Sequence, residues 1–228
     1  MTHARSAGRL VGALVLAQTV GGVLVNFVLT APLFGPQGFL VGAAAHGDQI
    51  ALSALCGITL GLFSVAIAIA VCSVADARAK ALAQLLLALS TASLAATLVE
   101  QMNVVSMLAL SQAHAKLPTD EQAGFQGLRL VVAGARNSSH HIGLFVAGLT
   151  LLAFYATLLR AMLVPRALAA VGVVAACLQV IAVAMPLFGV PIVFLMLAPL
   201  GISQLALGLW LLAKGFPDLA NPPIRSGA

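Results

Sequence analysis

Six long apolar runs divide this chain, and each is long enough to cross a lipid bilayer as a helix. A spanning helix needs about 20 mainly apolar residues. The runs cover roughly residues 10–30, 49–74, 81–111, 142–162, 167–188 and 191–213. Because lipid cannot satisfy free backbone N–H and C=O groups, each run must be helical. The pattern therefore predicts an all-α fold, a polytopic membrane bundle of six transmembrane helices forming a single domain over residues 1–228.

Charged side chains are too sparse for a water-soluble domain. Asp, Glu, Lys and Arg make up only 7% of the chain, whereas a soluble domain carries about 25%. The composition excludes an ordinary soluble enzyme, a disordered chain and a nucleic-acid-binding domain. It predicts the lipid bilayer as the main partner and no nucleic acid.

The basic residues predict how the bundle is oriented. The run at 10–30 exceeds the apolar core of a cleavable signal peptide, about 7–15 residues, so we expect a retained first span. With the N-terminus inside, the three basic residues outside are Lys116, Arg129 and Arg136. The eight inside are Arg5, Arg9, Arg78, Lys80, Arg160, Arg166, Lys214 and Arg225. Because Lys and Arg favour cytoplasmic loops, both termini are predicted to be cytoplasmic.

The long outer connection between the third and fourth spans carries its own helical pattern. Thr119 and Gln122 form a plausible capping box. Apolar residues then recur near helical spacing at Phe125, Leu128, Val131, Val132 and Ala135. We expect a short amphipathic helix here, lying on the outer membrane surface.

Glu100 is the most informative ionisable residue. It follows Lys80 by 20 positions, or about 30 Å of helix, which places it in the outer part of the third span. Asn103 and His114 share its face, and Gln101 lies on an adjacent face. A carboxylate at this depth is expected to face the bundle interior and find a partner. Three readings remain open: a structural acid that is internally paired, a ligand-binding or acid/base catalytic residue, and simple exposure at the outer interface.

Four of the five histidines fall on the predicted outer side. His140 and His141 open the fourth span, His114 ends the third, and His46 precedes the second. Asp48 and Arg136 are also expected at the mouth of an outer cavity. Imidazole is a common ligand of transition metals and haem. We therefore expect His140, His141 and His114 as candidate metal ligands, although no diagnostic spacing is present and histidines also favour wet membrane interfaces.

Part of the second half resembles a family of bacterial inner-membrane proteins grouped as a domain of unknown function, DUF4386. The resemblance runs through His141-Ile142-Gly143-Leu144-Phe145, residues 160–168, and the segment from Leu197 that ends Trp210-Leu211-Leu212-Ala213-Lys214-Gly215-Phe216. It covers about residues 142–216, a third of the chain. It implies a six-span, multi-pass protein of the bacterial inner (plasma) membrane. It implies no established activity and supplies no catalytic residues.

Three functional hypotheses follow. The leading one is an outward-facing polar cavity around Glu100 and the histidines that binds a metal, haem or an amphiphilic small molecule, with Glu100 as acid/base if the protein is an enzyme. The second is a small proton-coupled secondary transporter, with a polar path that continues inward through Gln179 and Gln204. The third is a non-catalytic accessory subunit. A homo-oligomer or a membrane-protein partner is compatible with each.

Overall fold

The computed structural model describes residues 3–118 and 122–217, so Thr119, Asp120, Glu121 and Arg225 lie outside the described residues. The described residues form seven α-helices: α1 His3–Leu24, α2 Phe39–Gly42, α3 Gly47–Cys72, α4 Lys80–Ala115, α5 Phe125–Arg160, α6 Arg166–Ala184 and α7 Ala198–Lys214. Helix α2 is a single turn. Each of the other six helices, taken together with any adjoining 3-10 or π segment, is long and apolar enough to cross a membrane. The predicted all-α, six-span membrane bundle is confirmed.

Proline and glycine set several helix ends. Pro165 takes an extended ψ of 133° directly before α6 begins, and proline cannot continue a preceding helix. Gly215 ends α7 with a φ of 70°, a left-handed conformation that glycine adopts without strain. The predicted fifth and sixth spans extend beyond α6 and α7 because Met185–Phe188 and Phe194–Met196 form 3-10 turns instead.

The expected amphipathic surface helix is not a separate element. Phe125 to Arg160 is one unbroken α-helix of 36 residues, about 54 Å long. No proline interrupts this stretch, so nothing in the backbone forces a bend between the amphipathic segment and the span. The segment is instead the first part of α5, and the prediction of a helix lying on the membrane surface was wrong.

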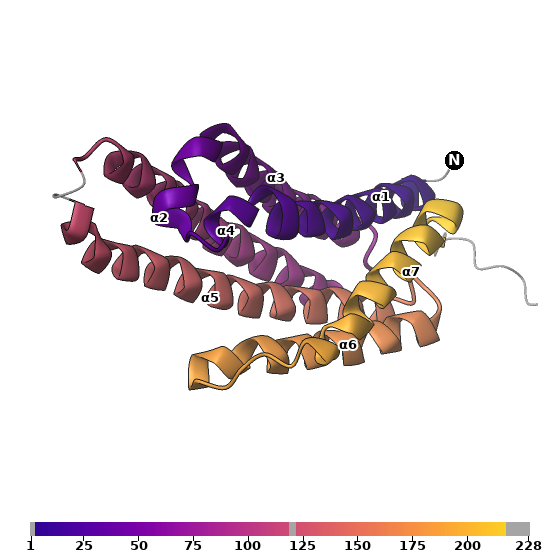
Figure 1. Cartoon of the computed structure of the whole chain (residues 1–228). Coiled ribbons are helices and arrows are strands. Elements are labelled where there is room, and N and C mark those ends of the chain that lie inside the picture. Colours follow the sequence, from indigo (N-terminus) through magenta and orange to yellow (C-terminus); the bar gives the residue numbers. More distant parts are fainter. Residues whose placement is uncertain (1–2, 119–121, 218–228) are drawn as a thin grey trace, which may run out of the picture.

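The helices run back and forth between two ends of the bundle (Figure 1). At the near end, α1 begins and α7 finishes, and the loops at 73–79 and 161–165 join neighbouring helices. At the far end, α3 begins, α4 finishes and α5 begins. Helices α4 and α5 form a long hairpin that projects past the others at the far end.

The first and last helices pack against each other (Figure 1). Glycines make this approach possible. A Cβ on Gly12 would lie 2.8 Å from the carbonyl oxygen of Gly208, and a Cβ on Gly208 would lie 2.6 Å from Leu16. Small residues at helix interfaces of membrane proteins permit such close backbone contact. The ring of helices is therefore closed by α1 and α7, which are far apart in the sequence.

Large apolar side chains point outward, while several polar ones point inward. Phe27, Leu195 and Ile202 are among the most exposed apolar residues. Ser53, Ser90 and Thr157 are buried. Water would penalise this distribution, whereas hydrocarbon favours it, so the chain is a multi-pass membrane protein whose outer surface contacts lipid.

Candidate functional site

A cleft of about 290 Å³ lies between α1, α3, α4 and α5 in the far half of the bundle. We call it the Glu100 cleft. Its charged and titratable lining is Glu100 on α4 together with Arg136 and His140 on α5. Its apolar lining includes Leu60, Val104 and Leu144. The cleft thus combines a polar head region with an apolar body inside one membrane domain.

Glu100 connects α4 to α5 through two contacts on the same carboxylate oxygen. Nδ1 of His140 lies 2.8 Å from Oε1 of Glu100, and Nη2 of Arg136 lies 3.4 Å from it. An ionised carboxylate only accepts hydrogen bonds, so the imidazole N–H donates. Oε2 has no hydrogen-bond partner among the described residues and remains available to a ligand. A Cβ added to Gly143 would lie 3.8 Å from this oxygen.

The depth of these residues follows from helix length. His140 precedes Arg160, at the near end of α5, by 20 residues, and Glu100 follows Lys80, at the near end of α4, by the same number. At 1.5 Å per residue, both lie about 30 Å from the near end. That distance matches the thickness of the hydrocarbon core, so the charged group lies near the far membrane interface.

Phe34 covers Arg136 from the connection between α1 and α2. The guanidinium carbon of Arg136 lies 4.7 Å from the centroid of the Phe34 ring. Such a cation–π contact is favourable when the cation is partly removed from water. Arg136 is only 7% exposed, and Phe34 therefore helps to close the charged region on its far side.

Two buried polar atoms in the cleft lining have no hydrogen-bond partner among the described residues: Nε of Arg136 and Oε1 of Gln101. Gln101 is 7% exposed, and its side chain packs against Gly57, where an added Cβ would lie 2.8 Å from Nε2. Buried polar groups in folded proteins are nearly always paired. Two residues of the cleft lining therefore carry an unpaired donor and an unpaired acceptor, both of which are closed to solvent in this structure.

Asn103 acts one turn beyond Glu100 as a structural link. Its Nδ2 donates to Oγ of Ser139 at 3.0 Å, and that hydroxyl donates to the carbonyl oxygen of Arg136 at 2.9 Å. This chain of hydrogen bonds holds the Arg136 segment of α5 against α4. Asn103 is absent from the cleft lining, and its contacts support the site rather than form it.

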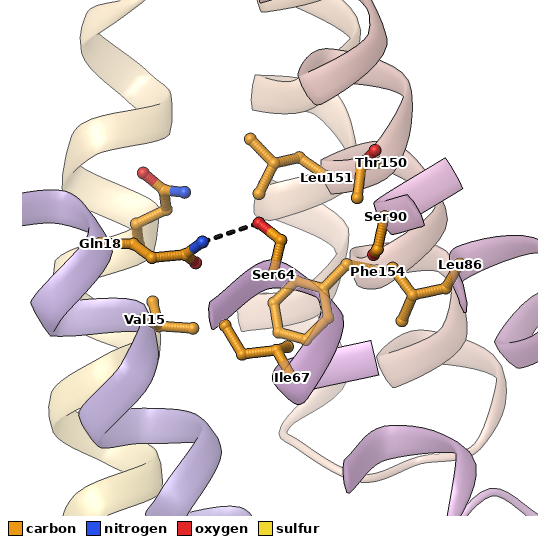
Figure 2. Close-up of a pocket in the computed structure, with 10 residues that line it drawn as sticks. Val15, Gln18, Ser64, Ile67, Leu86, Ser90, Thr150, Leu151 and Phe154 are labelled. Atoms are coloured by element: carbon orange, nitrogen blue, oxygen red, sulfur yellow. Dashed lines mark hydrogen bonds between the residues drawn. The ribbon is translucent and has the colours of Figure 1, made fainter. Parts of the chain in front are cut away.

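A small inner pocket adjoins the Glu100 cleft and shares lining residues with it. Figure 2 shows the residues that line this pocket. Gln18 and Ser64 line both spaces and are joined by a hydrogen bond of 2.7 Å. The inner pocket holds only about 30 Å³, roughly the room of one water molecule. Gln204 lines it, as do the apolar Ile67, Leu86 and Phe154. Gln179 is buried elsewhere and is not part of this lining.

The other residues expected at the site lie apart from Glu100. His46 and Asp48 line a separate surface pocket at the start of α3, and Nδ1 of His46 lies 3.0 Å from the carbonyl oxygen of Gly42. His114 packs edge-on against Phe125, with ring centroids 5.7 Å apart. His141 lies edge-on to His140 at 5.8 Å but does not line the cleft.

The expected metal site formed by His140, His141 and His114 is not supported. Within residues 3–118 and 122–217, no group of three His, Cys, Asp or Glu side chains is placed to hold a metal ion. The histidines share one end of the bundle, but they sit on different helix faces. Nδ1 of His140 contacts Glu100, whereas the His114 ring packs against Phe125 instead.

Some lining residues were not identified from the sequence as parts of a site. Phe34 lies in an irregular loop, and nothing in the sequence around it predicts its contact with Arg136. Gln18 and Ser64 are ordinary polar residues within apolar spans, where a hydrogen bond between helices is the default role. Only the depth of Gln18 within the first span could have drawn attention to it.

A comparison with protein-family models matches residues 10–215 to DUF4386, a domain of unknown function. The match spans both halves of the chain, beyond the residues 142–216 that carried the resemblance in the sequence. Searches of curated proteins and of solved structures returned no match.

Proposed function

We propose that this chain, which belongs to the DUF4386 family, binds an amphiphilic small molecule in the Glu100 cleft, with the polar head of the molecule at Glu100, Arg136 and His140. The observation that carries the proposal is the lining of the cleft, which combines a charged group that leaves Oε2 of Glu100 without a described partner with apolar side chains. A ligand whose head carries a hydrogen-bond donor would pair with this oxygen, and its apolar part would contact Leu60 and Leu144.

The shape of the cleft supports a ligand that arrives from lipid. The main packing partners of α1 are α3 and α7, whereas those of α5 are α4 and α6. The cleft is lined by α1 on one side and by α5 on the other, and these two helices are not main packing partners of each other within the described residues. Phe34 covers the charged group on its far side. A molecule in the adjacent leaflet would enter sideways between α1 and α5.

The chemistry of the head region also permits proton transfer. Glu100 and His140 are 2.8 Å apart, within the reach required of an acid/base pair. If the bound molecule is also a substrate, Glu100 would exchange a proton with it and His140 would orient the carboxylate. We place the protein in the bacterial inner membrane with this cleft opening in the outer half, as the family resemblance and the basic residues of the near end favour.

A second candidate function is proton-coupled transport. It is favoured by the inner pocket, because Gln18 and Ser64, which are hydrogen-bonded to each other (Figure 2), line both spaces. Gln204 adds a further polar side chain to the inner pocket. Ile67, Leu86 and Phe154 close this route with apolar side chains. Transport would therefore require these side chains to move apart, whereas binding in the cleft requires no movement.

The test compares purified wild-type protein with Glu100→Gln and with Asp48→Asn as the matched control. Asp48 is also an acid at the far end, but it lines a different pocket. Small molecules that co-purify with each protein are extracted and identified by mass spectrometry. We expect an amphiphile that accompanies the wild type and Asp48→Asn and is reduced at least about tenfold in Glu100→Gln.

Circular dichroism and gel filtration establish that both variants remain folded. An equal amount of the amphiphile in all three proteins would overturn the proposal. The absence of any co-purifying amphiphile from the wild-type protein would also overturn it. The same preparations in proteoliposomes separate the second candidate: net flux of the identified molecule, lost in Glu100→Gln, indicates transport, and binding without flux indicates a static site.

A further inference from the structure

A second cavity lies at the near end, between α4, α5 and α6. We call it the near-end groove; it measures about 700 Å³. Arg78, Arg160 and Arg166 line it, and its apolar walls include Leu82, Ala156 and Val173. The three arginines come from three separate places: the loop before α4, the last residue of α5 and the first residue of α6. The fold thus gathers them around one groove.

The positive charge of this groove is not neutralised within the described chain. None of the three arginines forms an ion pair with a described carboxylate. The nearby carboxylate of Asp76 accepts a hydrogen bond from the backbone N–H of Ala79 instead. Arginine presents a planar set of donors that matches phosphate oxygens. The groove therefore has the charge and the hydrogen-bond donors to bind an anion.

The start of α6 adds further donors at the same place. Arg166 is its first residue, and no side chain caps the free backbone N–H groups of its first turn. The first N–H groups of a helix, together with its dipole, favour an anion at that end. This end of α6 therefore supports the same charge preference as the three arginines.

The walls of the groove extend into the hydrocarbon. Ala156 lies four residues before Arg160 and Val173 seven residues after Arg166, which correspond to depths of about 6 and 10 Å below the arginines. Free phosphate gains no binding energy from contact with such apolar walls, whereas the glycerol and first methylenes of a lipid are stabilised by it. Basic pockets between spanning helices recognise anionic lipid head groups in this way.

We infer that the near-end groove is a binding site for an anionic phospholipid, with its phosphate on Arg78, Arg160 and Arg166 and the start of its acyl chains against Ala156 and Val173. The lipid comes from the leaflet at the near end of the bundle. This site is separate from the Glu100 cleft, which lies about 30 Å away along α5, and it does not depend on the proposed function.

The test uses native mass spectrometry of the full chain in detergent, with dioleoyl phosphatidylglycerol or dioleoyl phosphatidylcholine added. The Arg160→Gln/Arg166→Gln variant removes two charges from the groove. The control, Arg5→Gln/Lys214→Gln, removes two charges from the same end but outside the groove. We expect the groove variant to weaken phosphatidylglycerol binding about 30-fold, and the control to weaken it less than about threefold.

A third variant separates a lipid from free phosphate. Val173→Phe fills the apolar part of the groove without changing its charge, and we expect it to weaken phosphatidylglycerol binding as well. Equal losses in the groove and control variants would show only a diffuse surface potential and overturn the inference. Displacement of the lipid by inorganic phosphate at similar concentration, or unchanged binding in Val173→Phe, would also overturn it.

Discussion

Glu100 and Arg136 bring opposite charges together inside a membrane domain, where single charges are costly. Each is largely buried, with side-chain exposures of 16% and 8%. Charged residues at membrane depth are tolerated when they pair and face the bundle interior. The pair is stretched at 3.4 Å, and Arg136 retains an unpaired Nε. The two residues therefore neutralise each other without exhausting their capacity to bind a third group.

A double-mutant cycle tests whether the pair acts as a unit. We expect Glu100→Gln and Arg136→Gln each to lower the free energy of unfolding by about 1–3 kcal/mol. The first leaves the Arg136 guanidinium buried without its ion pair, and the second leaves the Glu100 carboxylate with only His140 as a described partner. The double variant should lose less than the sum, with a coupling of about 1–2 kcal/mol.

Unfolding in mixed detergent micelles measures these differences. As a control, Asp48→Asn combined with Arg136→Gln should be additive, since Asp48 lies in a different pocket. Additive effects of Glu100→Gln and Arg136→Gln would show that the two side chains do not interact in the folded protein.

At the scale of elements, α5 determines where the site lies. One helix carries Arg136, His140 and the apolar wall at Leu144, so their positions are rigidly related. Its first part, which has the amphipathic pattern of a surface helix, instead projects together with the end of α4 beyond the other helices. Ser139 and Asn103 hold this part against α4. The side chains that bind α5 to α4 thus also present the arginine to the glutamate.

The continuity of α5 can be tested with proline. Gly134→Pro should break the helix just before Arg136, because proline removes a backbone hydrogen bond and clashes with the preceding turn, a cost of about 3 kcal/mol. Gly127→Pro is the matched control, since Gly127 lies in the first turn of α5, where proline is tolerated. An added Cβ at either glycine meets no atom within 4 Å.

Thermal unfolding in detergent, followed by circular dichroism, measures the difference. We expect a clearly lower Tm for Gly134→Pro than for Gly127→Pro. Similar Tm values would indicate that a hinge already exists before Arg136 and that the first part of α5 behaves as a separate helix.

At the scale of the whole molecule, charge is divided between the two ends. Seven described basic residues lie at the near end: Arg5, Arg9, Arg78, Lys80, Arg160, Arg166 and Lys214. The Glu100 cleft lies in the opposite half, because Glu100 and His140 are each 20 residues, or about 30 Å, from Lys80 and Arg160 along their helices. By the preference of Lys and Arg for the cytoplasmic side, we predict that the near end is cytoplasmic and that the cleft lies in the outer half of the bilayer.

Cysteine labelling in intact cells tests this orientation. With Cys56, Cys72 and Cys177 replaced by alanine, Arg78→Cys reports on the near end and Lys116→Cys on the far end. Both positions are exposed. We expect a membrane-impermeant maleimide to label Lys116→Cys in intact cells and Arg78→Cys only after permeabilisation. The reverse pattern would place the Glu100 cleft in the inner half.

The sequence alone determined the six-span helical bundle, because the length and apolarity of each run are local properties and lipid permits only a helix. It also located Glu100 and four of the five histidines toward one end, since helical rise converts residue number into depth. Only the tertiary structure decided that Glu100 meets Arg136 and His140 rather than His46 or His114, and that α1 packs on α7. Such contacts depend on which helices become neighbours and how each is rotated about its axis. Those choices are made by the packing of all the helices together.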